Sequence, residues 1–237
     1  MVTAADPGET RTSVWLVHRP TTPPRRRTEA PSGLDRERIT AATVRLLDAE
    51  GLARFSMRRL AAGLGVTAMS LYWYVDTKHD LLELALDRAL GELSPGELSP
   101  GGPALGGPAL GGPALGGPAL GGPALSAGSG GGPAETGWPG GLKCLARAYR
   151  RVLADHPWVA PLSAAYPNIG PHARAFDAAL QRLMDATGLV GATRTGAQLA
   201  VRQFLHGCGG AVRRTPEGDF CLALDVLIAG IEVKATA

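Results

Sequence analysis

Residues 56–82 (SMRRLAAGLGVTAMSLYWYVDTKHDLL) show the pattern of two short helices joined by a tight turn, with a third helix directly after them. Ser56 can cap the first helix, whose apolar residues recur at helical spacing. Gly65 follows the last apolar position, where a left-handed residue ends a helix at little cost. Thr67 can cap the second helix, predicted from Ala68 to about Tyr74. A helix of about two turns is unstable alone, so its neighbours must hold it.

Helices are also predicted on both sides of this stretch. Thr77 and Asp80 form a variant of the capping box, with Asp in place of Glu or Gln, and predict the start of the third helix. Upstream, Asp35 can cap a helix that runs from Leu34 to Ala49. Three helices and the start of a fourth therefore predict a compact helix-turn-helix domain over residues 34–90.

Over this region the chain resembles the tetracycline-repressor (TetR) family of one-component transcription regulators. The resemblance rests on LDAEG, SMRRLAAGLGV and SLYWYVDTKHDLL, and LYWYV with the following lysine is similar to the tetracycline-repressor branch itself. DFCLALDVLIAGIEV resembles the last helix of that branch's regulatory domain, and SVWL with the basic arm at 13–27 resembles the N-terminal extension of some members. The resemblance implies an all-α protein, with an N-terminal three-helix helix-turn-helix DNA-binding domain and a helical C-terminal ligand-binding and dimerisation domain.

Changes of composition divide the chain into four stretches. Residues 1–33 form a basic, Pro-rich arm that is predicted to be disordered, and 34–90 form the DNA-binding domain. Residues 91–141 form a low-complexity linker, in which GELSP occurs twice and GGPAL five times. Proline at every fifth position and paired glycines prevent a regular helix there. This repeat is either a neutral expansion or a tether that loosens the coupling between ligand and DNA. Residues 142–237 return to helical periodicity as the regulatory and dimerisation domain.

Helical spacing and proline positions indicate the elements of this last stretch. Helices are predicted at 142–154, 172–186, about 192–206 and about 218–233. The proline-containing segments PWVAPL and YPNIGP are predicted to be loops. By the resemblance, the last two helices pair with their copies in a second subunit as a four-helix bundle. The apolar series that either forms this dimer face or packs inside one subunit is Phe220, Leu224, Leu227, Ile228 and Ile231.

A helix-turn-helix dimer presents two recognition helices to major grooves one helical turn apart, so a near-palindromic operator is expected. By the resemblance, Arg58 reaches into the groove, where a guanidinium pairs with guanine O6 and N7; the alternative is a phosphate contact. Thr67, Ala68 and Met69 open the recognition helix and suit apolar contact with thymine methyl groups. Lys78 begins the next helix, where its ammonium and the free backbone amides can bind one phosphate. The predicted DNA-binding residues are Met57, Arg58, Thr67, Ala68, Met69, Tyr72, Trp73, Tyr74 and Lys78.

Aromatic and basic residues extend this predicted surface. Tyr72 and Tyr74 offer hydroxyl groups to phosphates, and Trp73 packs either on the sugar–phosphate backbone or on the domain core. Arg25, Arg26 and Arg27 form either an arm along the minor groove or a solvated tail. Charge agrees with phosphate contact, because residues 19–78 carry 11 Lys/Arg against 6 Asp/Glu, whereas 91–237 carry 11 against 10. The expected partners are therefore double-stranded operator DNA, a second copy of the chain and a small-molecule effector.

Other function classes find little support in the sequence. It carries no Ser-His-Asp signature, P-loop, Rossmann glycine pattern or zinc-ligand cluster, so neither a catalytic residue nor a cofactor is expected. No run of about 20 apolar residues indicates a membrane span. Cys208 and Cys221 are predicted to be buried free thiols, which agrees with a cytoplasmic location. The alternatives are a DNA-binding protein that responds to no effector, or a helical enzyme.

The effector is the least defined part of this interpretation. Tetracycline repressors bind a magnesium–drug complex through histidines and acidic groups, and His156, His172 and His206 cannot be aligned with that site. No metal is therefore predicted, and a generic apolar or aromatic pocket is expected instead. Its candidate residues, each of which is alternatively a core residue, are Trp158, Tyr166, Phe176, Met184 and Phe204.

Overall fold

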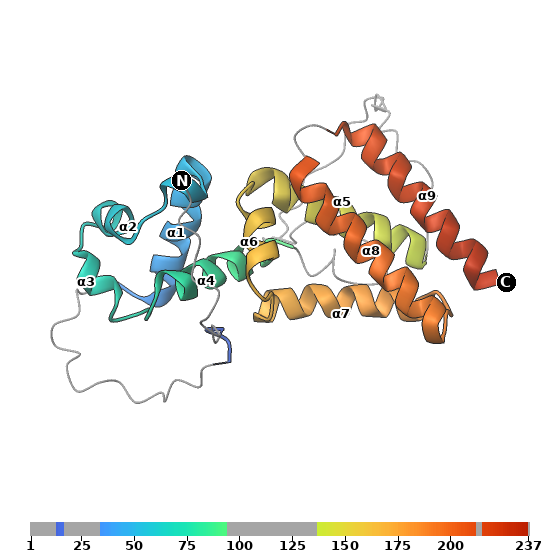
Figure 1. Cartoon of the computed structure of the whole chain (residues 1–237), viewed down its shortest axis with the longest axis horizontal. Coiled ribbons are helices and arrows are strands. Elements are labelled where there is room, and N and C mark those ends of the chain that lie inside the picture. Colours follow the sequence, from blue (N-terminus) through green and yellow to red (C-terminus); the bar gives the residue numbers. More distant parts are fainter. Residues whose placement is uncertain (1–12, 17–33, 94–136, 212–214, 237) are drawn as a thin grey trace, which may run out of the picture.

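The computed structural model describes residues 13–16, 34–93, 137–211 and 215–236, and the regular elements of these ranges are all helical (Figure 1). The predicted all-α class is therefore confirmed. The helices of the N-terminal part are α1 (Arg36–Glu50), α2 (Met57–Leu64), α3 (Ala68–Leu71) and α4 (Lys78–Leu90), with a short 3-10 turn at Leu52–Arg54. The helices of the C-terminal part are α5 (Trp138–Asp155), α6 (Val159–Ala165), α7 (Pro171–Ala186), α8 (Gly191–Ala211) and α9 (Glu217–Thr236).

The predicted helix caps of the N-terminal part are present. Asp35 accepts a hydrogen bond from the Arg38 amide at 2.6 Å, and Ser56 and Thr67 likewise cap α2 and α3. Gly65 ends α2 with a left-handed φ of 68°, which glycine adopts without steric cost. The side chains of Thr77 and Asp80 bond each other's backbone amides as a capping box. These local bonds set where each short helix begins or ends, and packing against neighbouring helices supplies the rest of its stability.

Several elements differ from the prediction, and α8 and α9 both run past their predicted ends, to Ala211 and Thr236. The recognition helix α3 ends at Leu71, and the residues up to Tyr74 form a turn. Helix α5 begins at Trp138, four residues early, with Pro139 in its first turn. PWVAPL was predicted to be a loop, which is wrong, because Pro161 lies in the first turn of α6. Amides of a first turn have no acceptor within the helix, so proline is tolerated in both places.

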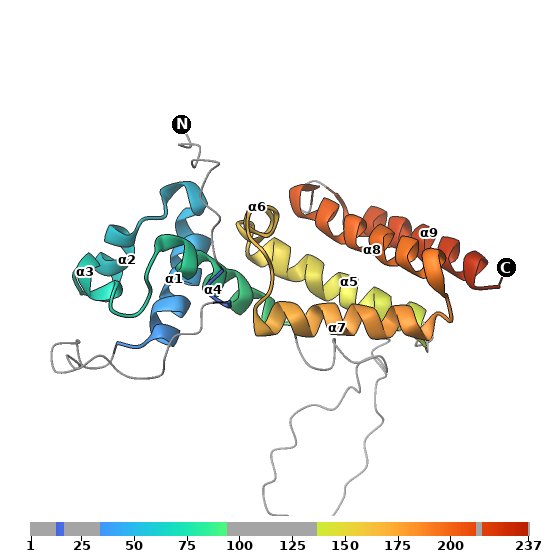
Figure 2. The ribbon, with the colours of Figure 1, turned by 60° about the horizontal axis from the view of Figure 1, so that its bottom comes forward.

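Helix α4 connects the two parts of the chain and is buried over most of its length (Figure 2). It packs on α1 along one side, and on α5, α6 and α7 along the other. Leu81, Ala85 and Ala89 are fully buried in this position, and Leu71 and Val75 anchor the recognition helix in the same core. A movement of α4 would therefore change the contacts of both parts.

Residues 13–16 contact α4, although all of residues 1–33 were predicted to be disordered. The Ser13 hydroxyl donates to Oε2 of Glu83 at 2.5 Å, and the Val14 amide donates to the same oxygen at 3.2 Å. Both Ser13 and Glu83 are buried. A buried carboxylate requires donors, and this segment supplies them, which explains why it is ordered. Arg25, Arg26, Arg27 and the GGPAL repeat lie outside the described residues.

Removing the Ser13 hydroxyl should therefore destabilise the fold. We expect Ser13→Ala to lower the free energy of unfolding by about 1.5–3 kcal/mol, the usual range for a hydrogen bond to a charged group. Chemical denaturation of the full chain measures this change. Leu16→Ala is the control, because Leu16 is exposed in the same segment. Equal unfolding midpoints for wild type and Ser13→Ala would contradict the contact.

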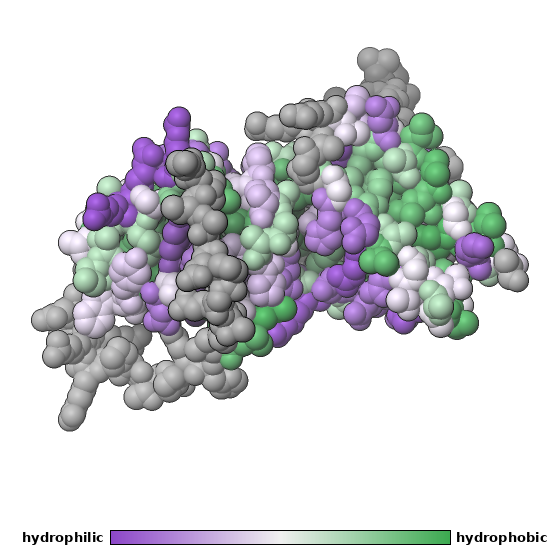
Figure 3. All heavy atoms as spheres, in the orientation of Figure 1, coloured by the Kyte–Doolittle hydropathy of each residue, from purple (hydrophilic) through white to green (hydrophobic). Residues whose placement is uncertain are grey.

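Four of the five residues in the predicted apolar series of α9 pack inside one subunit, which is the alternative to the predicted dimer face, whereas Leu227 is half-buried and lines a hollow between α8 and α9. Phe220, Leu224, Ile228 and Ile231 are buried in the common core. The opposite side of α9 is apolar as well and stays exposed, and hydrophobic side chains gather over this helix in Figure 3. Its exposed residues include Leu222, Val226 and Val233. Among the described helices, none is long and apolar enough to cross a membrane.

Candidate DNA interface and effector pocket

The recognition helix lies at the end of the molecule farthest from α8 and α9 (Figure 1). Met69 is 72% exposed, and Tyr72 and Trp73 are 44% and 49% exposed. Thr67 and Arg58 are exposed as well. Large apolar and aromatic side chains seldom gather on a free surface without a binding role. Five of the nine predicted DNA-binding residues are thus exposed on α2, on α3 and its cap, and on the turn after α3.

Three of the predicted DNA-binding residues lie deeper. Met57 is 8% exposed and belongs to the hydrophobic core, so its side chain packs the domain and offers no surface for a base. Met57 directly precedes the exposed Arg58, and the helical turn of about 100° per residue points the two side chains in different directions. Ala68 and Tyr74 are half-buried and pack against the core.

Lys78 is the first residue of α4, and its ammonium is half-enclosed. Its Nζ donates to the carbonyl oxygen of Phe55 at 3.3 Å and lies 5.4 Å from the centroid of the Phe55 ring. The sequence pattern did not indicate this contact, since Phe55 is 23 residues away. An ammonium has three donors, so the bond to Phe55 leaves others for a phosphate. Nearby, Arg59 joins α2 to α1 through an ion pair of 2.8 Å with Glu50.

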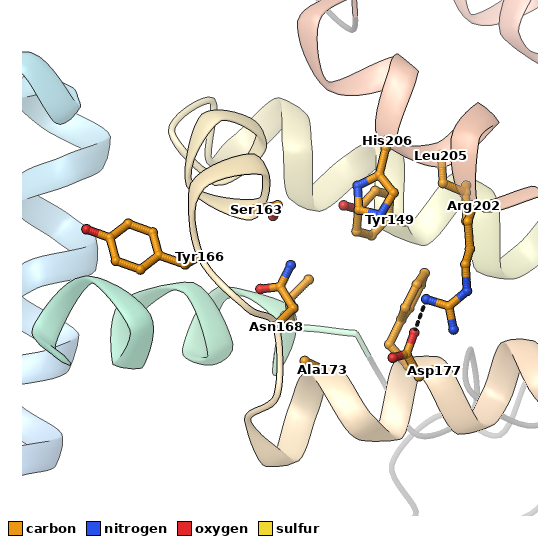
Figure 4. A pocket seen from close by; sticks show the side chains of 11 residues that line it. Tyr149, Ser163, Tyr166, Asn168, Ala173, Asp177, Arg202, Leu205 and His206 are labelled. Carbon is orange, nitrogen blue, oxygen red and sulfur yellow. Dashed lines mark ion pairs between the residues drawn. The ribbon is translucent and has the colours of Figure 1, made fainter. Parts of the chain in front are cut away.

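A cavity of about 280 Å³ lies between α5, α6, α7 and α8 and reaches the end of α4 (Figure 4). Two of the predicted effector residues, Tyr166 and Phe176, line it. The complete lining is Leu90, Tyr149, Ser163, Tyr166, Asn168, Ala173, Phe176, Asp177, Arg202, Leu205 and His206. Its size is close to the lower end of small-molecule sites, about 300 Å³.

The cavity combines aromatic walls with hydrogen-bonding groups. The rings of Tyr149 and Phe176 lie 5.1 Å apart and form one wall. Arg202 and Asp177 form an ion pair of 2.9 Å, so they neutralise each other within the lining (Figure 4). Burial raises the pKa of the Tyr149 hydroxyl, and the buried Oγ of Ser163 lies close enough to that hydroxyl to offset part of the rise, but this Oγ makes no hydrogen bond of good geometry among the described residues. Burying such a group costs free energy, and a ligand in the cavity can supply the missing bond.

The other predicted effector residues are placed elsewhere. Trp158 is buried and donates from Nε1 to Oδ1 of Asp48, on α1, at 2.6 Å. Met184 is fully buried in the core, and Phe204 stacks on Phe220 with centroids 5.3 Å apart. None of these three lines this cavity, because an apolar residue in a helical pattern is often part of the core; Phe204 lines a separate hollow of about 300 Å³ between α5, α8 and α9.

The histidines are dispersed rather than gathered in a metal site. His156 lies against α1, His172 is exposed near the start of α7, and His206 lines the cavity. Within the described ranges, no group of three His, Cys, Asp or Glu side chains is placed to hold a metal ion. Cys208 and Cys221 are free thiols and half-buried rather than buried.

Polar contacts link the cavity region to the DNA-binding part. The hydroxyl of Tyr166, which ends α6, forms a hydrogen bond with Nδ1 of His79 in the first turn of α4. Asp87 of α4 accepts bonds from the amides of His172 and Ala173, each at 3.0 Å, and so caps the N-terminus of α7. Helix α4 thus contacts both ends of the segment between α6 and α7, which borders the cavity.

Comparison with known proteins finds separate family models for the N-terminal and the C-terminal part of the chain. Residues 39–85 match the family model described as bacterial regulatory proteins, tetR family, and residues 131–215 match the tetracyclin repressor-like C-terminal domain. An HTH-type transcriptional regulator of Saccharopolyspora erythraea is 32% identical over 73% of this chain and 59% of its own length. The HTH-type transcriptional repressor DrrR1 of Streptomyces coeruleorubidus is 31% identical over 58% of this chain and 38% of its own.

The chain thus spans less than two thirds of the length of these two relatives. Among solved structures, ActR of Streptomyces coelicolor in complex with actinorhodin superposes with a TM-score of 0.62 at 20% identity, over 86% of this chain and 99% of that one. At this identity the likeness shows the shared fold. Both domains of the chain therefore have counterparts in proteins that regulate transcription.

Proposed function

The chain belongs to the tetracycline-repressor (TetR) family of bacterial regulatory proteins, and from this premise we propose that it is a dimeric repressor that binds a near-palindromic operator and is released by a small molecule. The family and the curated relatives are transcription regulators, not enzymes. The observation that carries the proposal is the exposed surface formed by Met69, Tyr72 and Trp73 on and after a short, anchored helix. A regulator of this kind works on DNA in the cytoplasm.

The proposed contacts divide into base and phosphate contacts. Thr67 and Met69 occupy the exposed start of the recognition helix, where apolar atoms suit thymine methyl groups. Arg58 reads a guanine from the start of α2. Tyr72, Trp73, Tyr74 and Lys78 contact the sugar–phosphate backbone. The experiment for this function is retardation of DNA from the protein's own promoter by the purified chain, and absence of any retarded complex would contradict it.

Substituting Arg58 should change specificity at one base position. We expect Arg58→Ala to cost about 1–3 kcal/mol of binding free energy at the contacted guanine and to relax the preference there, because one bidentate contact is lost. Competition between operator variants, each with one base pair changed, measures this effect. An equal loss of affinity for all variants would contradict the base contact and favour the phosphate alternative.

Substituting Lys78 should weaken binding to every sequence. We expect Lys78→Ala to reduce the slope of the logarithm of the binding constant against the logarithm of the salt concentration by about one, because one phosphate contact is lost. Titrations at several salt concentrations give the slope. Lys143→Ala is the control, because Lys143 is on α5, paired with Asp225 at 2.7 Å. A slope unchanged in Lys78→Ala would remove Lys78 from the phosphate contacts.

The proposed dimer face is the outer side of α8 and α9. A hollow of about 560 Å³ runs between these helices, and its lining is mostly apolar and small, with Gly196, Ala197, Ala200, Val226 and Gly230 among the residues. Small residues allow a helix of a second copy to approach closely. Two helices from each subunit would then form the four-helix bundle that the family resemblance implies, with Leu222, Val226 and Val233 covered.

The proposed effector is an uncharged aromatic compound with hydroxyl or carbonyl oxygens. The aromatic wall of Tyr149 and Phe176 suits a flat ring system, and Ser163 and Asn168 offer polar groups to its edge. A charged ligand is disfavoured because Arg202 and Asp177 already neutralise each other. The solved ActR complex with actinorhodin is a fold-level precedent for a ligand-binding member.

Thermal-shift screening of such compounds tests the effector part. Binding to the folded chain raises its apparent stability, and an effector must also release the operator. Replacing Phe176 by Ala should remove both responses. A compound library that neither raises the melting temperature nor releases DNA would favour the alternative of a DNA-binding protein that responds to no effector.

A further inference from the structure

A buried histidine lies where the two parts of the chain meet. His156 is 6% exposed and ends α5. Its two ring nitrogens face carboxylates of the other part: Nδ1 lies 2.6 Å from Oδ1 of Asp48, and Nε2 lies 3.0 Å from Oε2 of Glu92. Asp48 is in the last turn of α1, and Glu92 follows α4. One imidazole ring therefore joins the corner between α5 and α6 to the ends of α1 and α4.

These two contacts together require a charged ring. An ionised carboxylate only accepts hydrogen bonds, and a neutral imidazole carries a single N–H. A neutral ring would thus donate to one carboxylate and turn a lone pair toward the other. Burial lowers the pKa of His156, but the hydrogen bonds that the ring donates to Asp48 and Glu92, together with the negative charges of these carboxylates, outweigh burial, and the net pKa lies above the ordinary 6.5.

The neighbouring tryptophan strengthens the contact to α1. Trp158 donates from Nε1 to the same Oδ1 of Asp48 at 2.6 Å, and its ring meets that of His156 edge-on, with centroids 5.6 Å apart. Asp48 is therefore held by two donors from the regulatory part. Among the described residues, the charged groups that act on the His156 ring are Asp48, from α1, and Glu92, from the segment after α4.

We propose that His156, as an imidazolium between Asp48 and Glu92, is the positioning residue that fixes the DNA-binding part on the regulatory part, so that operator binding depends on its proton. The DNA readout of this inference rests on the proposed function, whereas the protonation state of the ring does not. Since the folded-state pKa is raised, the contact is complete below pH 6.5, the ordinary value, and is lost as the pH rises through the folded-state pKa. Above that pKa, the ring is neutral and the DNA-binding part is held less firmly on the regulatory part of the same chain.

Nuclear magnetic resonance of the ¹⁵N-labelled histidine side chains tests the protonation state in the full chain. The His156 signals are those missing from His156→Gln. We expect both ring nitrogens to carry protons at pH 6.5, with a titration midpoint above that value. A neutral ring with a single tautomer at pH 6.5 would overturn the proposal.

The pH profile of operator affinity tests the consequence. As the pH rises from about 6 through the titration midpoint measured by NMR, at constant ionic strength, wild-type affinity should fall roughly fivefold or more because the contact is lost, which is the lower end of usual coupling between sites. His156→Gln should stay at the weaker level, and His156→Lys, charged throughout, at the tighter level. His172→Gln is the matched control, an exposed histidine that should keep the wild-type profile.

The outcomes separate the two claims. A His156→Gln profile identical to that of wild type, or a His156→Lys profile that stays at the weaker level, would overturn the role of the proton in positioning. If wild type retards no operator while His156 is an imidazolium, the proposed function fails and the charged contact stands.

Discussion

Val226→Glu should convert the protein to a monomer and lower its operator affinity roughly 100-fold or more. A dimer that contacts two half-sites at once binds about 10²–10⁴ times more tightly than a single subunit that contacts one. Val226 is 67% exposed on the outer side of α9 and lines the hollow between α8 and α9. In the proposed dimer a carboxylate at this position would be buried against apolar helices without a partner, which association cannot tolerate. Sedimentation or light scattering measures the mass, and gel retardation measures the affinity.

The subunit itself should stay folded in this variant, since Val226 faces away from its core. Arg174→Glu is the control, because it places a carboxylate on the exposed face of α7. The control should keep the mass and the operator affinity within a few-fold of wild type. A Val226→Glu protein that is still dimeric would place the subunit contact on another surface.

Leu71→Ala should lower the free energy of unfolding by about 2–5 kcal/mol and abolish tight operator binding. Leu71 is fully buried, and it is the last residue of a four-residue recognition helix that packs on α2. So short a helix has little stability of its own. The buried side chain therefore holds the whole recognition surface, and its removal leaves a cavity below it.

Met69→Ala is the matched change on the other face of the same helix. Met69 is 72% exposed, so its removal should alter the free energy of unfolding by less than about 0.5 kcal/mol. It should instead change the preference between base pairs, since an apolar contact with DNA is lost. Denaturant titration and operator competition separate the two effects. Similar stability losses in both variants would contradict the assignment of the two faces.

Local features of the fold could be predicted from the sequence because they depend on neighbours in the chain. Ser56, Thr67 and the Thr77–Asp80 capping box each act within one helical turn, so their spacing alone indicates them. Pro161 was misleading, because a proline is compatible with a first turn as well as with a loop. The Ser13–Glu83 contact could not be predicted, since it joins residues 70 positions apart.

The faces of α9 show why apolar periodicity has limits. Phe220 and Leu224 face the core, whereas Leu222 and Val226, on the same helix, remain exposed. A helix that is apolar around its whole circumference gives no preferred direction, so the sequence could not distinguish the inner stripe from the outer one. Packing against α5 and α8 makes that choice.

The proposed DNA-contact residues could be predicted from the sequence more fully than the residues of the cavity. The proposed DNA-binding residues lie within one short motif, and Arg58, Met69 and Tyr72 are all exposed there. The cavity is assembled from separate helices, so groups such as Arg202 and Asp177 have no common signature in the sequence. Two of the five predicted residues line it because aromatic side chains are frequent both in cores and in pockets.

Selection of bound sequences from random DNA by the full chain tests the central claim most directly. The account predicts an enriched near-palindrome, with half-sites centred about 10–10.5 base pairs, or a multiple of this spacing, apart, as two recognition helices of a symmetric dimer require. If a guanine in each half-site is enriched with the wild type but not with Arg58→Ala, the result would also support the proposed contact of Arg58 with that base. Enrichment of a single asymmetric site, or of no sequence at all, would contradict a symmetric, sequence-specific DNA-binding dimer.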